Sequence, residues 1–171
     1  GRKYDEVLYP FLNTTLTPAE FAKHVVISYE KAYQKLINDY TLSALNLSFS
    51  SEIEKNINQV ALTLVNALTE QQNRSVSDIL RKCKSTQYCT CFDEPSYIDL
   101  GHFYDNLLQH IAYITLKDKT LEGQIKADLN TLLAQGKSIL KNLVIENKVG
   151  SKLKNAQGLS VYFPEYSINN N

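Results

Sequence analysis

Cysteine and histidine are the residue types in this chain with the most obvious chemistry. Cys83, Cys89 and Cys91 lie within nine positions of one another, and a thiolate beside an imidazole can form the catalytic dyad of a cysteine peptidase. The candidate bases are His24, His102 and His110. The cysteines lie in a polar stretch without helical periodicity, and all three histidines fall in predicted helices. We therefore expect no catalytic residue in this chain.

The same cysteines, together with His102, could also form a tetrahedral zinc site. Structural zinc sites usually take their ligands in pairs separated by two to four residues. Here five residues lie between Cys83 and Cys89, and one residue lies between Cys89 and Cys91. We expect no metal and no cofactor. A loop disulfide and three free thiols both stay open, and the odd number leaves at least one cysteine without an intrachain partner.

The charge balance gives no indication of a partner. Lys and Arg together number 18, as do Asp and Glu, so no net field attracts nucleic acid or an anionic membrane. Many of the eleven tyrosines recur at helical spacing, which is typical of packing rather than of base stacking. Apolar stretches such as Val60–Leu68 are shorter than the roughly 20 residues of a membrane-spanning helix. We expect neither a nucleic-acid partner nor a membrane span.

Apolar residues at helical spacing predict most of the secondary structure. The clearest helix begins after Thr17, which is followed by Pro18 and, as in a capping box, by Glu20, and it should continue to about Asp39. A second helix should be capped by Ser50 or Ser51 and run to about Leu68. Three further helices are expected, at 75–83, 96–114 and 121–142. The remaining cysteine-containing stretch, 84–95, should be a loop.

Two or three strands complete the expected fold. Tyr40–Phe49 carries apolar groups on both faces and should be an inner strand, while Val144–Val149 is a candidate short strand. Gly158–Pro164 alternates apolar and polar residues and ends at a proline. We expect one mixed α/β unit over residues 1–171, about half helical.

Several segments resemble the region that follows the catalytic cysteine in clostripain-like peptidases, which are bacterial enzymes of the caspase/gingipain type. The most specific is Ala156–Pro164, which contains the sequence Gly-Leu-Ser-Val-Tyr-Phe-Pro. The other similar segments are Tyr4–Leu8, Ala22–Tyr33, Thr41–Ser48 and Tyr97–Leu100. Two positions depart from the family pattern: Asn46 stands where an Asp is expected, and Gly101-His102 stands where an aromatic and an acidic residue are expected.

This resemblance implies a caspase-like α/β fold in which the catalytic His and Cys lie upstream of the chain. The chain would then be the non-catalytic C-terminal portion of a cysteine endopeptidase that cleaves after basic residues, bracing the catalytic sheet. Its partners would be the upstream portion and a peptide or protein substrate, in a secreted or cell-surface protein. The start at Gly1-Arg2-Lys3 and the lack of Met favour a piece of a longer protein. The alternative is a peptidase-derived helical interaction module or pseudoenzyme.

Overall fold

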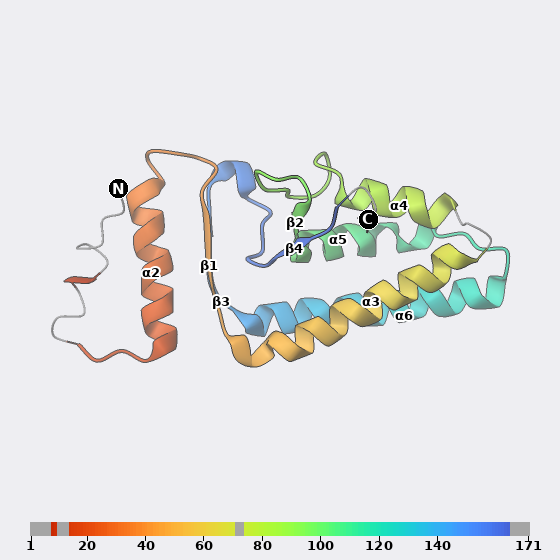
Figure 1. Ribbon diagram of the computed structural model, residues 1–171, viewed down its shortest axis with the longest axis horizontal. Helices are drawn as coiled ribbons and strands as arrows, with labels where there is room; N and C mark the ends of the chain where they lie inside the picture. Colours follow the sequence, from red (N-terminus) through yellow and green to blue (C-terminus); the bar gives the residue numbers. More distant parts are fainter. Residues whose placement is uncertain (1–7, 10–13, 71–73, 165–171) are drawn as a thin grey trace, which may run out of the picture.

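A computed structural model describes residues 8–9, 14–70 and 74–164 of the chain. The order of its elements is helix α2, strand β1, helices α3 and α4, strand β2, helices α5 and α6, and strands β3 and β4 (Figure 1). Most of the described chain is helical, and the four strands form two small antiparallel sheets. The fold is therefore of a general mixed helix-and-strand class. Of the Tyr4–Leu8 segment, only Leu8 lies within the described residues.

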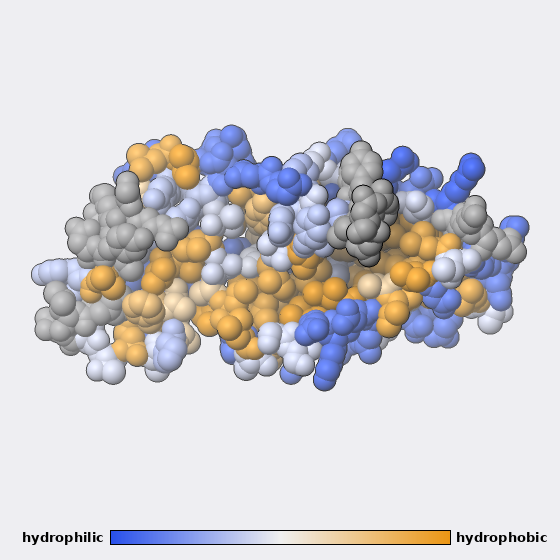
Figure 2. Space-filling model, viewed as in Figure 1, coloured by the Kyte–Doolittle hydropathy of each residue, from blue (hydrophilic) through white to orange (hydrophobic). Residues whose placement is uncertain are grey.

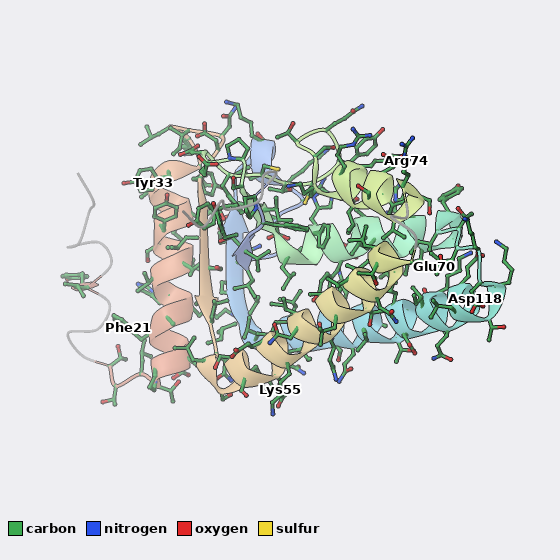
Figure 3. The ribbon with its side chains drawn as sticks, turned by 45° about the vertical axis from the view of Figure 1, so that its right-hand side comes forward. Phe21, Tyr33, Lys55, Glu70, Arg74 and Asp118 are labelled. Atoms are coloured by element: carbon green, nitrogen blue, oxygen red, sulfur yellow. The ribbon has the colours of Figure 1, made fainter. Side chains whose placement is uncertain are left out.

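The N-terminal layer consists of α2 (Pro18–Tyr33), β1 (Thr41–Leu45) and β3 (Val144–Val149). The two strands pair in register from Thr41 with Val149 to Ala44 with Glu146, and a bulge follows Ala44. Helix α2 packs against both strands, and Phe21 and Tyr33 mark its opposite ends in Figure 3. The predicted capping box is confirmed, because the Glu20 carboxylate accepts from the Thr17 N–H at 2.8 Å and the Glu20 N–H donates to the Thr17 hydroxyl at 3.3 Å.

The helical body consists of α3 (Ser50–Thr69), α4 (Arg74–Lys84), α5 (Leu100–His110) and α6 (Lys119–Leu143). Helices α3 and α6 run side by side for most of their length (Figure 1). The buried Asn56 side chain, 2% exposed, links α3 to α5 and α6. Its Nδ2 donates to Leu132 O of α6 at 2.8 Å, and its Oδ1 accepts from the Tyr104 hydroxyl of α5 at 3.0 Å. All fully buried members of the main apolar cluster lie between Ile53 and Leu143.

At the far end of the body, the carboxylate of Glu70 joins the end of α3 to the start of α6. It accepts hydrogen bonds from the N–H groups of Lys117 at 3.3 Å and Asp118 at 3.0 Å. Figure 3 shows Glu70, Arg74 and Asp118 at this same end of the molecule. Within the described residues, no helix is long and apolar enough to cross a membrane.

A second sheet lies against α5. Strand β2 (Tyr97–Asp99) pairs antiparallel with β4 (Ser160–Tyr162), in register from Tyr97 with Tyr162 to Asp99 with Ser160. The predicted alternation near the C-terminus is confirmed, since Val161 is half-buried while Ser160 and Tyr162 are exposed.

Three boundaries differ from the prediction. Residues 97–99 were expected to open a helix but form β2, because Ile98 and Asp99 pair with β4 and the helix begins only at Leu100. Helix α2 ends at Tyr33 rather than near Asp39. Helix α3 begins at Ser50 without a side-chain cap, because a short 3₁₀ turn over Leu47–Phe49 leads directly into it.

The described chain has four strands rather than two or three. Strand β1 is shorter than the Tyr40–Phe49 segment predicted, and it pairs with β3 alone among the described residues. The expected inner position of β1 would therefore require a further strand from outside the described part of the chain.

Candidate functional site at the Asp99 carboxylate

A network of hydrogen bonds surrounds Asp99, which ends β2 and caps α5. Its side chain is completely buried. Oδ1 accepts the His102 N–H at 2.8 Å, which is the usual role of an Asp N-cap. Oδ2 accepts the main-chain N–H groups of Gln157 at 2.7 Å and Gly158 at 3.2 Å. Asp99 therefore binds the α5 terminus and the 156–158 turn at once.

The opposite side of this turn is bound by the N-terminal layer. The Ser43 hydroxyl of β1 donates to Gly158 O at 2.6 Å, and Asn147 Nδ2 of β3 donates to Ala156 O at 2.8 Å. Gly158 has a φ of +100°, and a Cβ there would lie 3.1 Å from Val144 and 3.3 Å from Ser43. Glycine is thus required both by the backbone conformation and by the close approach to the sheet.

Two effects oppose each other at Asp99. Burial is the larger, and it raises the pKa of the carboxyl group, while the hydrogen bonds from the N–H groups of His102, Gln157 and Gly158 act to lower it. The side chain is sealed from solvent, with all of these donors fixed on the backbone. Its chemistry is therefore that of a structural hydrogen-bond acceptor that joins the start of α5 to the 156–158 turn, and it is not placed to exchange protons with a substrate.

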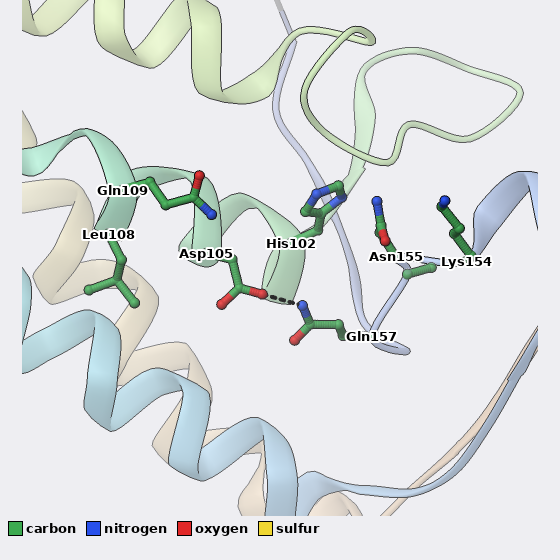
Figure 4. A pocket seen from close by; sticks show the side chains of 8 residues that line it. His102, Asp105, Leu108, Gln109, Lys154, Asn155 and Gln157 are labelled. Atoms are coloured by element: carbon green, nitrogen blue, oxygen red, sulfur yellow. Dashed lines mark hydrogen bonds between the residues drawn. The ribbon is translucent and has the colours of Figure 1, made fainter.

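A polar pocket lies beside this turn, between one face of α5 and residues 154–157, with a volume of about 570 Å³ (Figure 4). At one edge, Gln157 Nε2 donates to Asp105 Oδ2 at 2.6 Å. Lys137 Nζ completes a triad, 2.7 Å from both Gln157 Oε1 and Asp105 Oδ1. The Asp105 charge is therefore neutralised by Lys137. His102, Asn155 and Lys154 lie next to one another along the opposite side in Figure 4.

The cysteines are arranged for packing rather than for nucleophilic attack. None of the three forms a disulfide bond among the described residues, and Cys83 and Cys89 are buried. Burial raises the pKa of Cys83 to about 11. Burial, together with the electrostatic effect of nearby Cys91, raises the pKa of Cys89 to about 12. Both thiols are therefore protonated at neutral pH, and the nucleophilic thiolate is scarce.

Each histidine has one ring nitrogen within hydrogen-bond distance of a backbone or hydroxyl group. His102 Nδ1 accepts the Thr90 N–H at 3.0 Å, and the His110 ring donates from Nδ1 to Asn106 O at 2.7 Å. In the described chain, neither Cys83 nor Cys89 shares a hydrogen bond with His102 or His110. Cys89 donates instead to Asp99 O at 3.8 Å. His24, on α2, lies 3.1 Å from the Ser28 hydroxyl.

The four residues weighed as a zinc set do not form a site. Across the residues that the structure describes, no group of three or more Cys, His, Asp or Glu side chains is placed to hold a metal ion. The sulfur of Cys91 approaches the carbonyl oxygens of Lys84 and Cys89, each at 3.7 Å, rather than a shared metal position.

Sequence reasoning did not single out Asp99, Ser43 or Asn147 as site residues. Asp99 precedes the His102 N–H by three positions, which is the spacing of an N-cap, but the helix start had been placed at Ser96. The contacts of Ser43 and Asn147 with the 156–158 turn span sequence separations of 115 and 9 residues, and a strand pattern does not encode them.

The chain was compared with protein-family models, with curated proteins and with solved structures. No protein-family model matches the chain, and neither a curated protein nor a solved structure matches it.

Proposed function

We propose that this chain is the non-catalytic C-terminal portion of a clostripain-like cysteine endopeptidase that cleaves after basic residues, with a caspase-like sheet upstream. In this proposal the chain contributes the β1–β3 strands to that sheet and braces them with the helical body. A caspase-type site must hold its thiol and imidazole at a fixed separation, and an error near 1 Å can lower the rate about a hundredfold. By holding the catalytic sheet in place, this chain would therefore affect the rate of cleavage.

The observation that carries the proposal is the thinness of the N-terminal layer. Among the described residues its sheet has two strands, with α2 packed against both, whereas sheets in globular proteins usually have about four to six strands. Among the described residues before Ile53, the buried apolar residues are Val26, Tyr40 and Ala44. Large apolar side chains of this part are exposed instead, at Phe21, Leu36, Ile37 and Leu47. Figure 2 shows a band of apolar side chains between the sheet and helices α3 and α5.

Both edges of the sheet carry backbone groups that point outward. Gly150 N–H donates to Tyr40 O at 2.8 Å, and antiparallel pairing alternates along the strands. Because Tyr40 is hydrogen-bonded to Gly150, the residues at alternate positions, Thr41 and Ser43, have N–H groups that point away from β3. By the same alternation, those of Asn147 and Val149 face away from β1. An upstream strand could pair at either edge.

The test is to co-express the chain with the region that precedes it in the parent polypeptide. We expect the two pieces to co-elute and to show thiol-dependent cleavage of basic-residue reporter peptides, whereas the chain alone should show none. A stable monomer that gains nothing from the upstream region would overturn the proposal and favour the interaction module.

Edge prolines provide matched variants. Thr41→Pro and Val149→Pro each remove one outward N–H that β1–β3 pairing does not use, so each should change the stability of the isolated chain little. One of the two should abolish co-elution, because proline cannot donate to an added strand. Leu42→Pro is the control that removes an inward N–H, and it should destabilise the chain itself. If both edge variants still co-elute, the upstream region does not pair with this sheet.

A further inference from the structure

The polar pocket between α5 and residues 154–157 presents hydrogen-bond donors more than acceptors. His102 Nδ1 accepts the Thr90 N–H at 3.0 Å, and the Thr90 hydroxyl lies 2.9 Å from the same atom. A backbone N–H can only donate, so in the neutral ring the proton must be on Nε2. Among the described residues Nε2 has no hydrogen-bond partner, which leaves this N–H as a donor at the pocket wall.

The charge at this pocket is positive. Among the described residues that line it there is one carboxylate, Asp105, whose two oxygens are already bound by Lys137 and Gln157. The one lining cation is Lys154, whose ammonium has no ion-pair partner in the part of the chain that the structure describes. In Figure 4 the side chains of Lys154, Asn155 and His102 lie in a row. His102 is also one of the positions where the chain departs from the clostripain-like pattern, which has an acidic residue there.

We propose that this pocket binds a carboxylate group, presented by a small molecule or by an acidic side chain or C-terminus of a peptide. Its oxygens accept from Lys154 Nζ and from His102 Nε2–H, and charge-assisted bonds of this kind are stronger than neutral ones. Leu108 and Ala156 also line the pocket and supply an apolar wall for the carbon chain that carries the carboxylate.

A carboxylate fits better than a phosphate. Phosphate sites commonly use the free N–H groups at a helix N-terminus, and here Asp99 already caps α5 by accepting the His102 N–H at 2.8 Å. The described residues that line the pocket also include no Arg to bind a phosphate in a bidentate manner. One ammonium and one ring N–H match the two oxygens of a carboxylate instead.

The experiment is an NMR titration of the 171-residue chain with N-acetylglycine, following backbone amide shifts. We expect saturable shifts confined to residues around His102, Asn155 and Lys154, with a dissociation constant in the millimolar range because the pocket is open. N-acetylglycinamide, the neutral analogue, should produce no saturable shift. Inorganic phosphate should bind more weakly than N-acetylglycine.

Lys154→Gln should weaken N-acetylglycine binding by at least about tenfold, a loss appropriate to one charged contact. Lys152→Gln is the matched control, because this exposed lysine lies two positions away and faces Asp39 at 3.6 Å. Equal binding of the neutral amide, equal effects of the two lysine variants, or tighter binding of phosphate would overturn the proposal. A longer acidic peptide that binds more tightly than N-acetylglycine would identify a peptide as the source of the carboxylate.

Discussion

The Asp99 carboxylate accepts the main-chain N–H of Gln157 at 2.7 Å, although 58 positions separate the two residues. The same turn is bound from the other side by Ser43 and Asn147. One short segment therefore connects the β1–β3 sheet to the start of α5. If the sheet is part of a larger catalytic sheet, this connection is the route by which the helical body holds it in place.

Replacing Asp99 by Asn should destabilise the chain. The amide keeps one acceptor oxygen but turns its NH₂ group toward N–H donors, which leaves buried donors without a partner. We expect a loss of roughly 2 kcal/mol or more in the free energy of unfolding, measured by urea denaturation. Asp78→Asn, at a side chain that is 66% exposed, should change it by less than about 0.5 kcal/mol. Equal effects of the two variants would show that the Asp99 hydrogen bonds do not stabilise the fold.

Two glycines of α6 form a matched pair. A Cβ at Gly136 would collide with Asn56 Oδ1 and the Tyr104 ring, whereas a Cβ at Gly123 would meet nothing within 4 Å. Gly136→Ala should therefore cost about 1–3 kcal/mol through overpacking. Gly123→Ala should stabilise the chain by up to about 1 kcal/mol through helix propensity. Thermal unfolding of both variants measures the difference, and effects of the same sign would contradict the close packing of α3, α5 and α6.

Glu122 should make stability depend on pH in the acid range. Hydrogen bonds from Lys119 and Lys126, together with the Leu116 N–H, lower the pKa of Glu122 from its ordinary 4.5 to about 2. Because the pKa is lower in the folded state, the stabilisation is complete above about pH 4.5 and is lost as pH falls toward about 2.

Melting temperatures of Glu122→Gln should accordingly fall less steeply than those of the wild-type chain between these pH values. Glu54→Gln, at an exposed position of α3, is the control and should follow the wild type. A Glu122→Gln curve parallel to the wild-type curve would show that the Lys119 and Lys126 contacts do not form in solution.

Cys83 and Cys89 should resist alkylation in the folded chain. Their raised pKa values, about 11 and about 12, and their burial keep both thiols protonated and inaccessible at neutral pH. Iodoacetamide labelling followed by peptide mass spectrometry should modify Cys91, which is partly exposed, well before the other two. Equal labelling of the three, without denaturant, would contradict the buried arrangement.

Local patterns predicted the elements that depend on nearby residues. The Thr17–Glu20 capping box and the periodicity of α3 and α6 are read directly from spacing, and these elements are present. Strand β2 was missed because Tyr97–Asp99 is too short to carry a periodic signal and is fixed by distant β4. The role of Asp99 as a hydrogen-bond acceptor was not predicted either, because two of its donors, Gln157 and Gly158, are distant in the sequence.

Hydrogen exchange at the edges of the β1–β3 sheet tests the central claim most directly. In the isolated chain, the inward amides of Leu42 and Ala44 should be protected, while the outward amides of Thr41, Ser43, Asn147 and Val149 should exchange rapidly. Adding the upstream region should slow exchange at the outward amides of one edge, either Thr41 and Ser43 or Asn147 and Val149, by about a hundredfold or more. Unchanged exchange at both edges in the presence of the upstream region would contradict the account.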